Sequence, residues 1–366
     1  MQALDLPDGI RTRYVDNGNG LHMHVLEAGA PGHPCVLLLH GFPELAYSWR
    51  HVLPKLADAG YHVVAPDQRG YGRTTGWDGA YDGDLASFRM LNLVRDVVGL
   101  VTALGVEHVA VIGHDFGSPV AAWCALIRPD VFRAVALMSA PFSGAPGFST
   151  AADGADIHAA LAHLPRPRKH YQWYYSTREA DADMRACAQG LPAFLRAYYH
   201  MKSADWPSNA PYPLQSWTAS ELAEMPTYYI MDLHETMAQT VAPHMPRTAC
   251  AWLTDAELAV YAEEYARTGF QGGLQWYRCN TSGANTAELR LFAGRTIDVP
   301  AIFIAGASDW GVYQFPAAFE QMQSRACTDM RSCYLIEGAG HWVQQEQPEK
   351  TAVLLLGFLS EAFRPR

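Results

Sequence analysis

Short apolar stretches that alternate with helix-like segments constrain the fold of this chain more than any other feature. "CVLLLHG" (35–41) and "YHVVAPDQRG" (61–70) contain continuous apolar runs, and "FRMLNLVRDVVGLVTALG" (88–105) repeats apolar residues at helical spacing before a strand at 108–113. Strands that are apolar on both faces belong to parallel sheets that helices cover on both sides. The sequence therefore predicts an α/β fold in which helices flank a mostly parallel central sheet.

The α/β rhythm is interrupted in the middle of the chain. From about residue 144 to 297 the sequence is irregular and rich in Tyr, Trp, Pro and Met, and a clear strand returns only with "VPAIFIAGASD" (299–309). A chain of 366 residues is long enough for one large domain with an insertion. We therefore expect a core domain made of residues 1–143 and 298–366, with residues 144–297 inserted as a mainly helical lid.

The stretch "VAVIGHDFGSPVAAW" (109–123) joins a strand to a helix through Gly113, Asp115 and Gly117. This spacing is that of the nucleophile elbow of α/β-hydrolases, with aspartate in place of serine. A serine that attacked a saturated carbon would leave an ether, which water does not cleave. A carboxylate leaves an alkyl ester, which water can hydrolyse. Asp115 therefore points to substrates with a saturated electrophilic carbon, either epoxides or alkyl halides.

Two further polar residues follow strands of the predicted sheet. Asp309 comes after the strand at 300–306, and His341 comes after the strand at 333–337. Ligands of open parallel sheets bind beyond the carboxyl ends of the strands, so we expect both to lie near Asp115. The order nucleophile, acid, histidine is the one known for this fold. His341 is predicted to be the general base, oriented by Asp309.

Two backbone N–H groups are predicted to form an oxyanion hole. Phe116 follows Asp115 at the start of a helix, where N–H groups carry partial positive charge, and Phe42 lies in the loop after the strand at 35–39. Donors placed in this way stabilise the negative charge that develops when an ester carbonyl is attacked.

Five motifs together resemble the epoxide hydrolases of the α/β-hydrolase fold, over nearly the whole chain. They are "HGFPE" (40–44), "DQRGYGRT" (67–74), "GHDFGS" (113–118), "GASDWGV" (306–312) and "GAGHWVQQEQPE" (338–349). The resemblance implies an enzyme that needs no cofactor and converts epoxides to vicinal diols. It also implies a covalent hydroxyalkyl ester on Asp115.

The same resemblance implies two lid tyrosines that donate hydrogen bonds to the epoxide oxygen. "HYQWYY" (170–175) and "GFQGGLQWYRCN" (269–280) match the two contexts and indicate Tyr171 and Tyr277, with Tyr174 and Tyr175 as alternatives to the first. Aromatic residues beside the motifs are expected to line the substrate pocket: Phe42, Phe116, Trp173, Trp276 and Trp342.

Two other functions stay open. A haloalkane or haloacid dehalogenase would use the same set of Asp115, His341 and Asp309, but it needs donors for the halide or an arginine for the acid, and Phe116 offers no side-chain donor. A ligand-binding protein that does no chemistry is the second alternative. Such proteins usually lose part of the catalytic set, which is complete in this sequence.

Charge and composition limit the partners. The net charge of −10 supplies no basic face, which argues against nucleic acid or an anionic membrane. His22 and His24 lack a third ligand, so we expect no metal. We find neither a secretory signal pattern nor an apolar run that would span a bilayer, and we expect a cytoplasmic enzyme whose partners are a small apolar epoxide and water.

Overall fold

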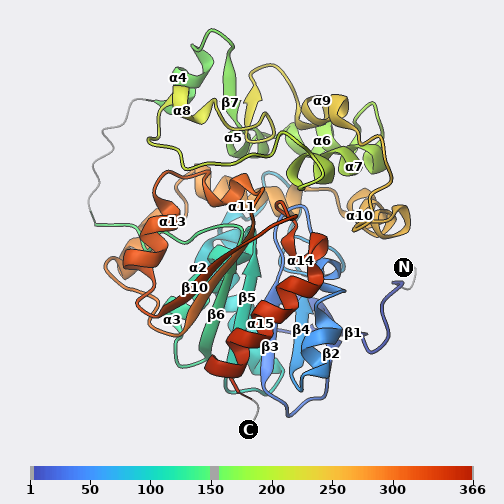
Figure 1. Ribbon diagram of the computed structural model, residues 1–366, viewed down its shortest axis with the longest axis vertical. Helices are drawn as coiled ribbons and strands as arrows, with labels where there is room; N and C mark the ends of the chain where they lie inside the picture. The colour runs from blue at the N-terminus through green and yellow to red at the C-terminus, as the bar shows by residue number, and fades with distance from the viewer. Residues whose placement is uncertain (1–3, 149–155, 365–366) are drawn as a thin grey trace.

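The computed structural model of the chain describes residues 4–148 and 156–364. In that part, eight strands form one sheet in the order β1-β2-β4-β3-β5-β6-β9-β10 (Figure 1). These strands are β1 (Arg11–Asp16), β2 (His22–Ala28), β3 (Cys35–Leu39), β4 (His62–Pro66), β5 (Val109–His114), β6 (Phe132–Met138), β9 (Ala301–Gly306) and β10 (Met330–Ile336). β2 pairs antiparallel with β1 and β4, whereas all the pairs from β4 to β10 are parallel. The predicted α/β fold is confirmed.

The burial of each strand explains whether the apolar pattern of the sequence predicts that strand. β3, β4, β5 and β9 are buried at every position, as their continuous apolar sequences require. β1 is an edge strand in which only Val15 is buried. Its sequence "RTRYVD" therefore contains no apolar run, and the pattern does not predict it.

Helices cover both faces of the sheet. Those packed on the faces are α1 (Leu53–Asp58), α2 (Met90–Ala103), α3 (Gly117–Ile127) and α15 (Pro348–Ala362). α2 buries Leu93, Val97 and Leu100 in the same apolar cluster as α3. This spacing of four and then three residues places them on one side of a helix. α15 buries Leu355 and Phe358 in the cluster on the opposite face, together with α1.

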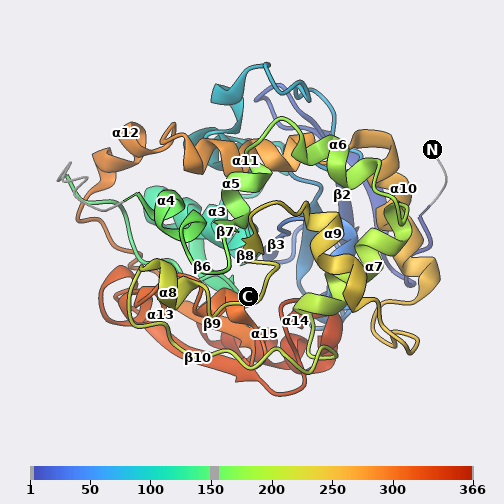
Figure 2. The same cartoon turned by 90° about the horizontal axis from the view of Figure 1, so that it is seen from above.

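The segment between β6 and β9 lies over the carboxyl ends of the parallel strands (Figures 1 and 2). Its elements are α4 (Ile157–Ala162), β7 (Arg168–His170), α5 (Tyr171–Tyr175), α6 (Ala180–Arg185), α7 (Leu191–Lys202), α8 (Ala219–Leu222), β8 (Ile230–Asp232), α9 (Met237–Val241), α10 (Asp255–Thr268), α11 (Gln271–Thr281) and α12 (Thr286–Leu289). β7 and β8 form a separate antiparallel pair. We call this segment the inserted segment. The exact division into core and lid stays a prediction, and part of it, 149–155, falls outside the described residues.

Shorter elements complete the structure. They are α13 (Ala318–Gln321), α14 (Val343–Glu346), 3₁₀ turns at Ala46–Trp49, Leu85–Phe88, Ala242–His244, Arg290–Phe292 and Trp310–Val312, and a π turn at Met322–Ala326. Among the described residues, no helix is both long and apolar enough to cross a membrane.

Candidate active site

The turn between β5 and α3 gives Asp115 an unusual backbone conformation. Asp115 has φ of +51°, in the left-handed region that residues with a side chain seldom adopt. Its N–H donates to Met138 O at 3.1 Å, and its C=O accepts from Ser118 N–H at 3.0 Å. These bonds on both sides hold the strained residue in place. Strain of this kind is typical of functional residues.

Glycines permit the close approach of three chain segments at this turn. A β-carbon on Gly113 would lie 2.8 Å from Ser118 N, and one on Gly41 would lie 2.7 Å from Cγ of Asp115. Neither position leaves room for a side chain. The glycines of "HGFPE" and "GHDFGS" therefore let the loop after β3 pack directly against Asp115.

The Asp115 carboxylate has a different partner on each oxygen. Oδ1 accepts a hydrogen bond from the Phe42 N–H at 2.8 Å, and Oδ2 lies 3.1 Å from Nε2 of His341. Nδ1 of His341 lies 3.0 and 3.1 Å from the two oxygens of Asp309. The Phe116 N–H lies one peptide beyond Asp115, just before α3. The structure thus brings Asp115, His341 and Asp309 together from the ends of three strands.

Electrostatics keep Asp115 ionised. Burial alone would raise the pKa of this carboxyl, but the hydrogen bond from His341 and the charges of His341 and Lys202 hold the pKa well below its ordinary value. Burial and Lys202 both disfavour a charged His341. Asp309 and the hydrogen bond with Asp115 outweigh them and raise the pKa of His341 to about 8.

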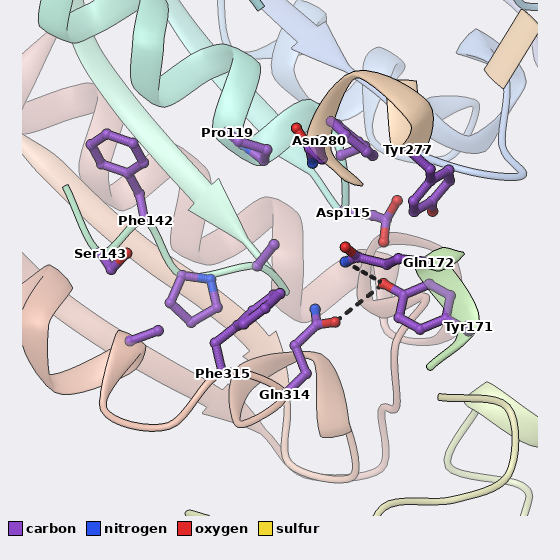
Figure 3. A pocket seen from close by; sticks show the side chains of 14 residues that line it. Asp115, Pro119, Phe142, Ser143, Tyr171, Gln172, Tyr277, Asn280, Gln314 and Phe315 are labelled. Atoms are coloured by element: carbon purple, nitrogen blue, oxygen red, sulfur yellow. Dashed lines mark hydrogen bonds between the residues drawn. The ribbon is translucent and has the colours of Figure 1, made fainter. Parts of the chain in front are cut away.

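Asp115 lies at a cavity of about 290 Å³ under the inserted segment (Figure 3). Tyr171 and Tyr277 also line the cavity, and their ring centroids are 5.9 Å apart. Burial, reinforced by the charge of Asp115, raises the pKa of both phenols well above its ordinary value. Both tyrosines therefore keep their protons at neutral pH and can donate hydrogen bonds to a ligand in the cavity.

The alternative tyrosines lie elsewhere. The hydroxyl of Tyr174 donates to Asp183 at 3.1 Å, and that of Tyr175 donates to Tyr198 at 3.2 Å. Neither residue is part of the cavity lining. The geometry therefore favours Tyr171 over both of them.

The predicted pocket aromatics divide into two groups. Phe116 lines the cavity, whereas Phe42, Trp173, Trp276 and Trp342 do not. The Phe42 ring packs edge-on against Tyr277, with centroids 5.5 Å apart. That these four side chains contact the substrate stays a prediction.

Each of the three tryptophans has neighbours that keep it out of the cavity. The indole N–H of Trp276 donates to Arg69 O at 3.0 Å, and that of Trp342 donates to Tyr199 O at 2.8 Å. These bonds hold both buried rings in the interior. Trp173 packs against His158, with ring centroids 3.8 Å apart.

Three amide side chains of the cavity were not predicted from the sequence. Gln172 donates to the Tyr171 hydroxyl at 3.2 Å, and that hydroxyl donates to Oε1 of Gln314 at 3.2 Å. Asn280 also lines the cavity. It follows Tyr277 by three residues on α11, so helical spacing offered a signal for it. Gln314 lies in an irregular loop, where no periodicity could indicate it.

A buried hydrogen-bonded pair, His114 and Glu44, contacts the backbone of His341. His114 lies 2.6 Å from Oε2 of Glu44 through Nδ1, and 2.7 Å from the backbone oxygen of His341 through Nε2. Glu44 also accepts from the side chains of Gln344 and Gln345, at 2.9 Å each. Both His114 and Glu44 are fully buried. Through these hydrogen bonds they hold the loop that carries His341, which we call the histidine loop.

Within the described ranges, no group of three or more His, Cys, Asp or Glu residues could hold a metal ion.

Known proteins match this chain over most of its length. The family model of the alpha/beta hydrolase fold matches residues 34–348. Epoxide hydrolase A of Mycobacterium tuberculosis (strain ATCC 25618 / H37Rv) is 37% identical over 359 residues, which cover 96% of this chain and 98% of that protein. Epoxide hydrolase B of the same strain is 34% identical over 360 residues, covering 94% of this chain and 96% of that protein.

Solved structures agree with these matches. An epoxide hydrolase from an endophytic Streptomyces superposes with a TM-score of 0.77 at 32% identity, covering 97% of this chain and 96% of that one. Epoxide hydrolase A from Mycobacterium thermoresistibile gives a TM-score of 0.76 at 35% identity, covering 96% and 98% of the two chains. The chain therefore belongs to the α/β-hydrolase family and, within it, to the epoxide hydrolases.

Proposed function

We propose that this enzyme hydrolyses small apolar epoxides to vicinal diols through an ester on Asp115. One observation carries the proposal: Asp115, Tyr171 and Tyr277 line the same cavity (Figure 3). A nucleophile and two proton donors around one space suit a reaction in which a carbon–oxygen bond forms while another breaks.

In the first step, Oδ2 of Asp115 attacks a ring carbon of the epoxide. The bond between that carbon and the ring oxygen breaks, and its electron pair stays on the oxygen. Tyr277 and Tyr171, which leaves its hydrogen bond to Gln314, donate hydrogen bonds to this oxygen, and one of them transfers its proton to it. Oδ1 keeps its hydrogen bond to the Phe42 N–H, at 2.8 Å in the free enzyme, and becomes the carbonyl oxygen of the ester.

In the second step, water attacks Cγ of Asp115, and Nε2 of His341 takes a proton from the water. Negative charge develops on Oδ1, where the N–H groups of Phe42 and Phe116 stabilise it. Asp309, 3.0 Å from Nδ1, stabilises the imidazolium that forms. The ester bond to Oδ2 then breaks, the leaving oxygen takes the proton of the new Asp115 carboxyl group, and the diol departs with that oxygen. The proton held by His341 returns to the tyrosine that lost one in the first step, which restores the free enzyme.

The inserted segment serves as the lid in this proposal, because α5 and α11 supply the two tyrosines. The cavity of about 290 Å³ is walled by apolar residues such as Phe142 and Phe315, and among the residues that the structure describes Asp115 is its one ionisable carboxylate. These walls support a small apolar epoxide as substrate. The cytoplasmic location stays a prediction.

A single turnover in ¹⁸O-labelled water tests the covalent route. With styrene oxide and enzyme in excess, the first diol should carry unlabelled oxygen from Asp115, and the label should appear in the carboxylate. The variant Asp115→Asn should make no diol, whereas Asp130→Asn, which changes an exposed carboxylate, should behave like the wild type. Heavy oxygen in the first diol would refute the ester. Halide release from chloroalkanes without diol from styrene oxide would favour a dehalogenase instead.

A further inference from the structure

Lys202 is a buried cation that the proposed chemistry does not use. It is the last residue of α7, and only 3% of its surface is exposed. Among the described residues its ammonium has neither a hydrogen-bond acceptor nor an ion-pair partner, and contacts aromatic rings instead. A buried ammonium is costly unless its surroundings stabilise the charge.

Four aromatic rings surround this ammonium. The distances from Nζ to the ring centroids are 5.0 Å for Tyr229, 5.3 Å for Trp342, 5.6 Å for Tyr198 and 6.0 Å for Tyr228. Rings at these distances attract a cation through their electron-rich faces. The Trp342 ring also contacts the His341 ring, with centroids 4.7 Å apart. The Lys202 ammonium and the His341 imidazole therefore both contact the Trp342 ring.

The backbone ties Lys202 to the histidine loop as well. The His341 N–H donates to the Lys202 C=O at 2.8 Å. Glu346 joins the same two segments, since its Oε2 accepts from the N–H groups of Gly340 at 2.9 Å and Ala204 at 2.8 Å. The end of α7 and the loop that carries His341 are thus fixed to each other.

The charged groups around Lys202 determine its effect. Burial lowers the pKa of Lys202, while the carboxylates of Asp115, Asp309 and Glu44 oppose that change. On His341, the ammonium acts against protonation, together with burial.

The neighbours that also face His341 are Asp115, Asp309, His114 through its ring, and Glu346 through the flanking N–H groups. When Asp115 becomes an ester it loses its negative charge, and the repulsion from Lys202 is then less compensated.

We propose that Lys202 is a positioning residue for the hydrolysis of the ester. Its C=O holds the main chain of His341, and its ammonium keeps the imidazole in the neutral, proton-accepting form once Asp115 is esterified. This inference rests on the proposed function, because it concerns the second step of that reaction.

The pH dependence of ester hydrolysis tests the proposal. The rate should rise with pH as His341 loses its proton, and Lys202→Met should move this rise upward by about one pH unit, because it removes a positive charge that disfavours the protonated imidazole. Lys202→Arg keeps the charge and should stay near the wild type. Lys169→Met removes another lysine of the inserted segment, which lies over Tyr174 at 4.9 Å, and should not move the rise. Rapid-quench mass spectrometry with styrene oxide measures the rates.

A titration of His341 by NMR removes the dependence on turnover. Asp115→Asn carries a neutral side chain like the ester, and the pKa of His341 is compared in this variant and in Asp115→Asn with Lys202→Met. A pKa about one unit higher without Lys202 supports the proposal even if the ester mechanism fails. If the methionine variant does not fold, Lys202→Gln takes its place. An unchanged pKa, or slower hydrolysis without a shift in pH dependence, would mean a structural role only and would overturn the proposal.

Discussion

Replacing Gly41 by alanine should misplace the nucleophile without removing any functional group. Gly41 follows β3 in "HGFPE" and packs against Asp115. Its backbone conformation does not require glycine, because its φ is not positive, so the effect of a side chain comes from contact alone.

The size of the effect follows from the distances. The new β-carbon would lie 2.7 Å from Cγ of Asp115 and still nearer to Oδ1 and Cβ. Carbon atoms in contact prefer separations of about 3.5–4.0 Å, so Asp115 or the loop must move by about 1 Å. Such a shift breaks the alignment of Oδ1 with the Phe42 N–H. A misplacement of about 1 Å costs roughly 100-fold in rate, and overpacking costs about 1–3 kcal/mol of stability.

Steady-state kinetics on styrene oxide and thermal unfolding together measure both effects. Gly357→Ala is the matched control, because Gly357 lies in α15 and no atom of the described part of the chain lies within 4 Å of the added carbon. It should keep full activity and gain up to about 1 kcal/mol of stability. Wild-type kcat/KM in Gly41→Ala would refute the claim that this glycine sets the position of Asp115.

Two further outcomes are expected. Tyr171→Phe or Tyr277→Phe alone should slow formation of the ester about 100-fold or more, and the double variant should abolish ester formation. Full activity of these variants in stopped-flow measurements would reject the role of the two tyrosines as proton donors. Asp115→Asn should lower the pKa of His341 from about 8, because the carboxylate that stabilises the imidazolium is gone; a pKa that stays at about 8 by NMR would contradict this cause.

The parallel sheet was predictable because its strands are buried on both faces. β3, β5 and β9 are apolar at nearly every position, and parallel strands end at one edge of a sheet. That topology alone indicates that residues after different strands approach one another. The edge strand β1 was not predictable, since its polar side chains face solvent.

The surroundings of the site were less predictable, because they depend on contacts between distant segments. Aromatic residues in a lid sequence look alike, and only the structure shows that Trp276 and Trp342 donate to backbone oxygens in the interior. The position of Lys202 also depends on contacts between distant segments. A lysine at a helix end is ordinarily exposed, and its burial depends on rings from the inserted segment and from the histidine loop.

Mass spectrometry of His341→Gln after incubation with styrene oxide tests directly whether Asp115 forms a covalent ester with the substrate. This variant can form the ester but lacks the base that hydrolyses it. An adduct with the mass of one substrate is expected on the peptide that contains Asp115, attached to that side chain. Unmodified protein, or an adduct on another residue, would show that Asp115 is not the nucleophile.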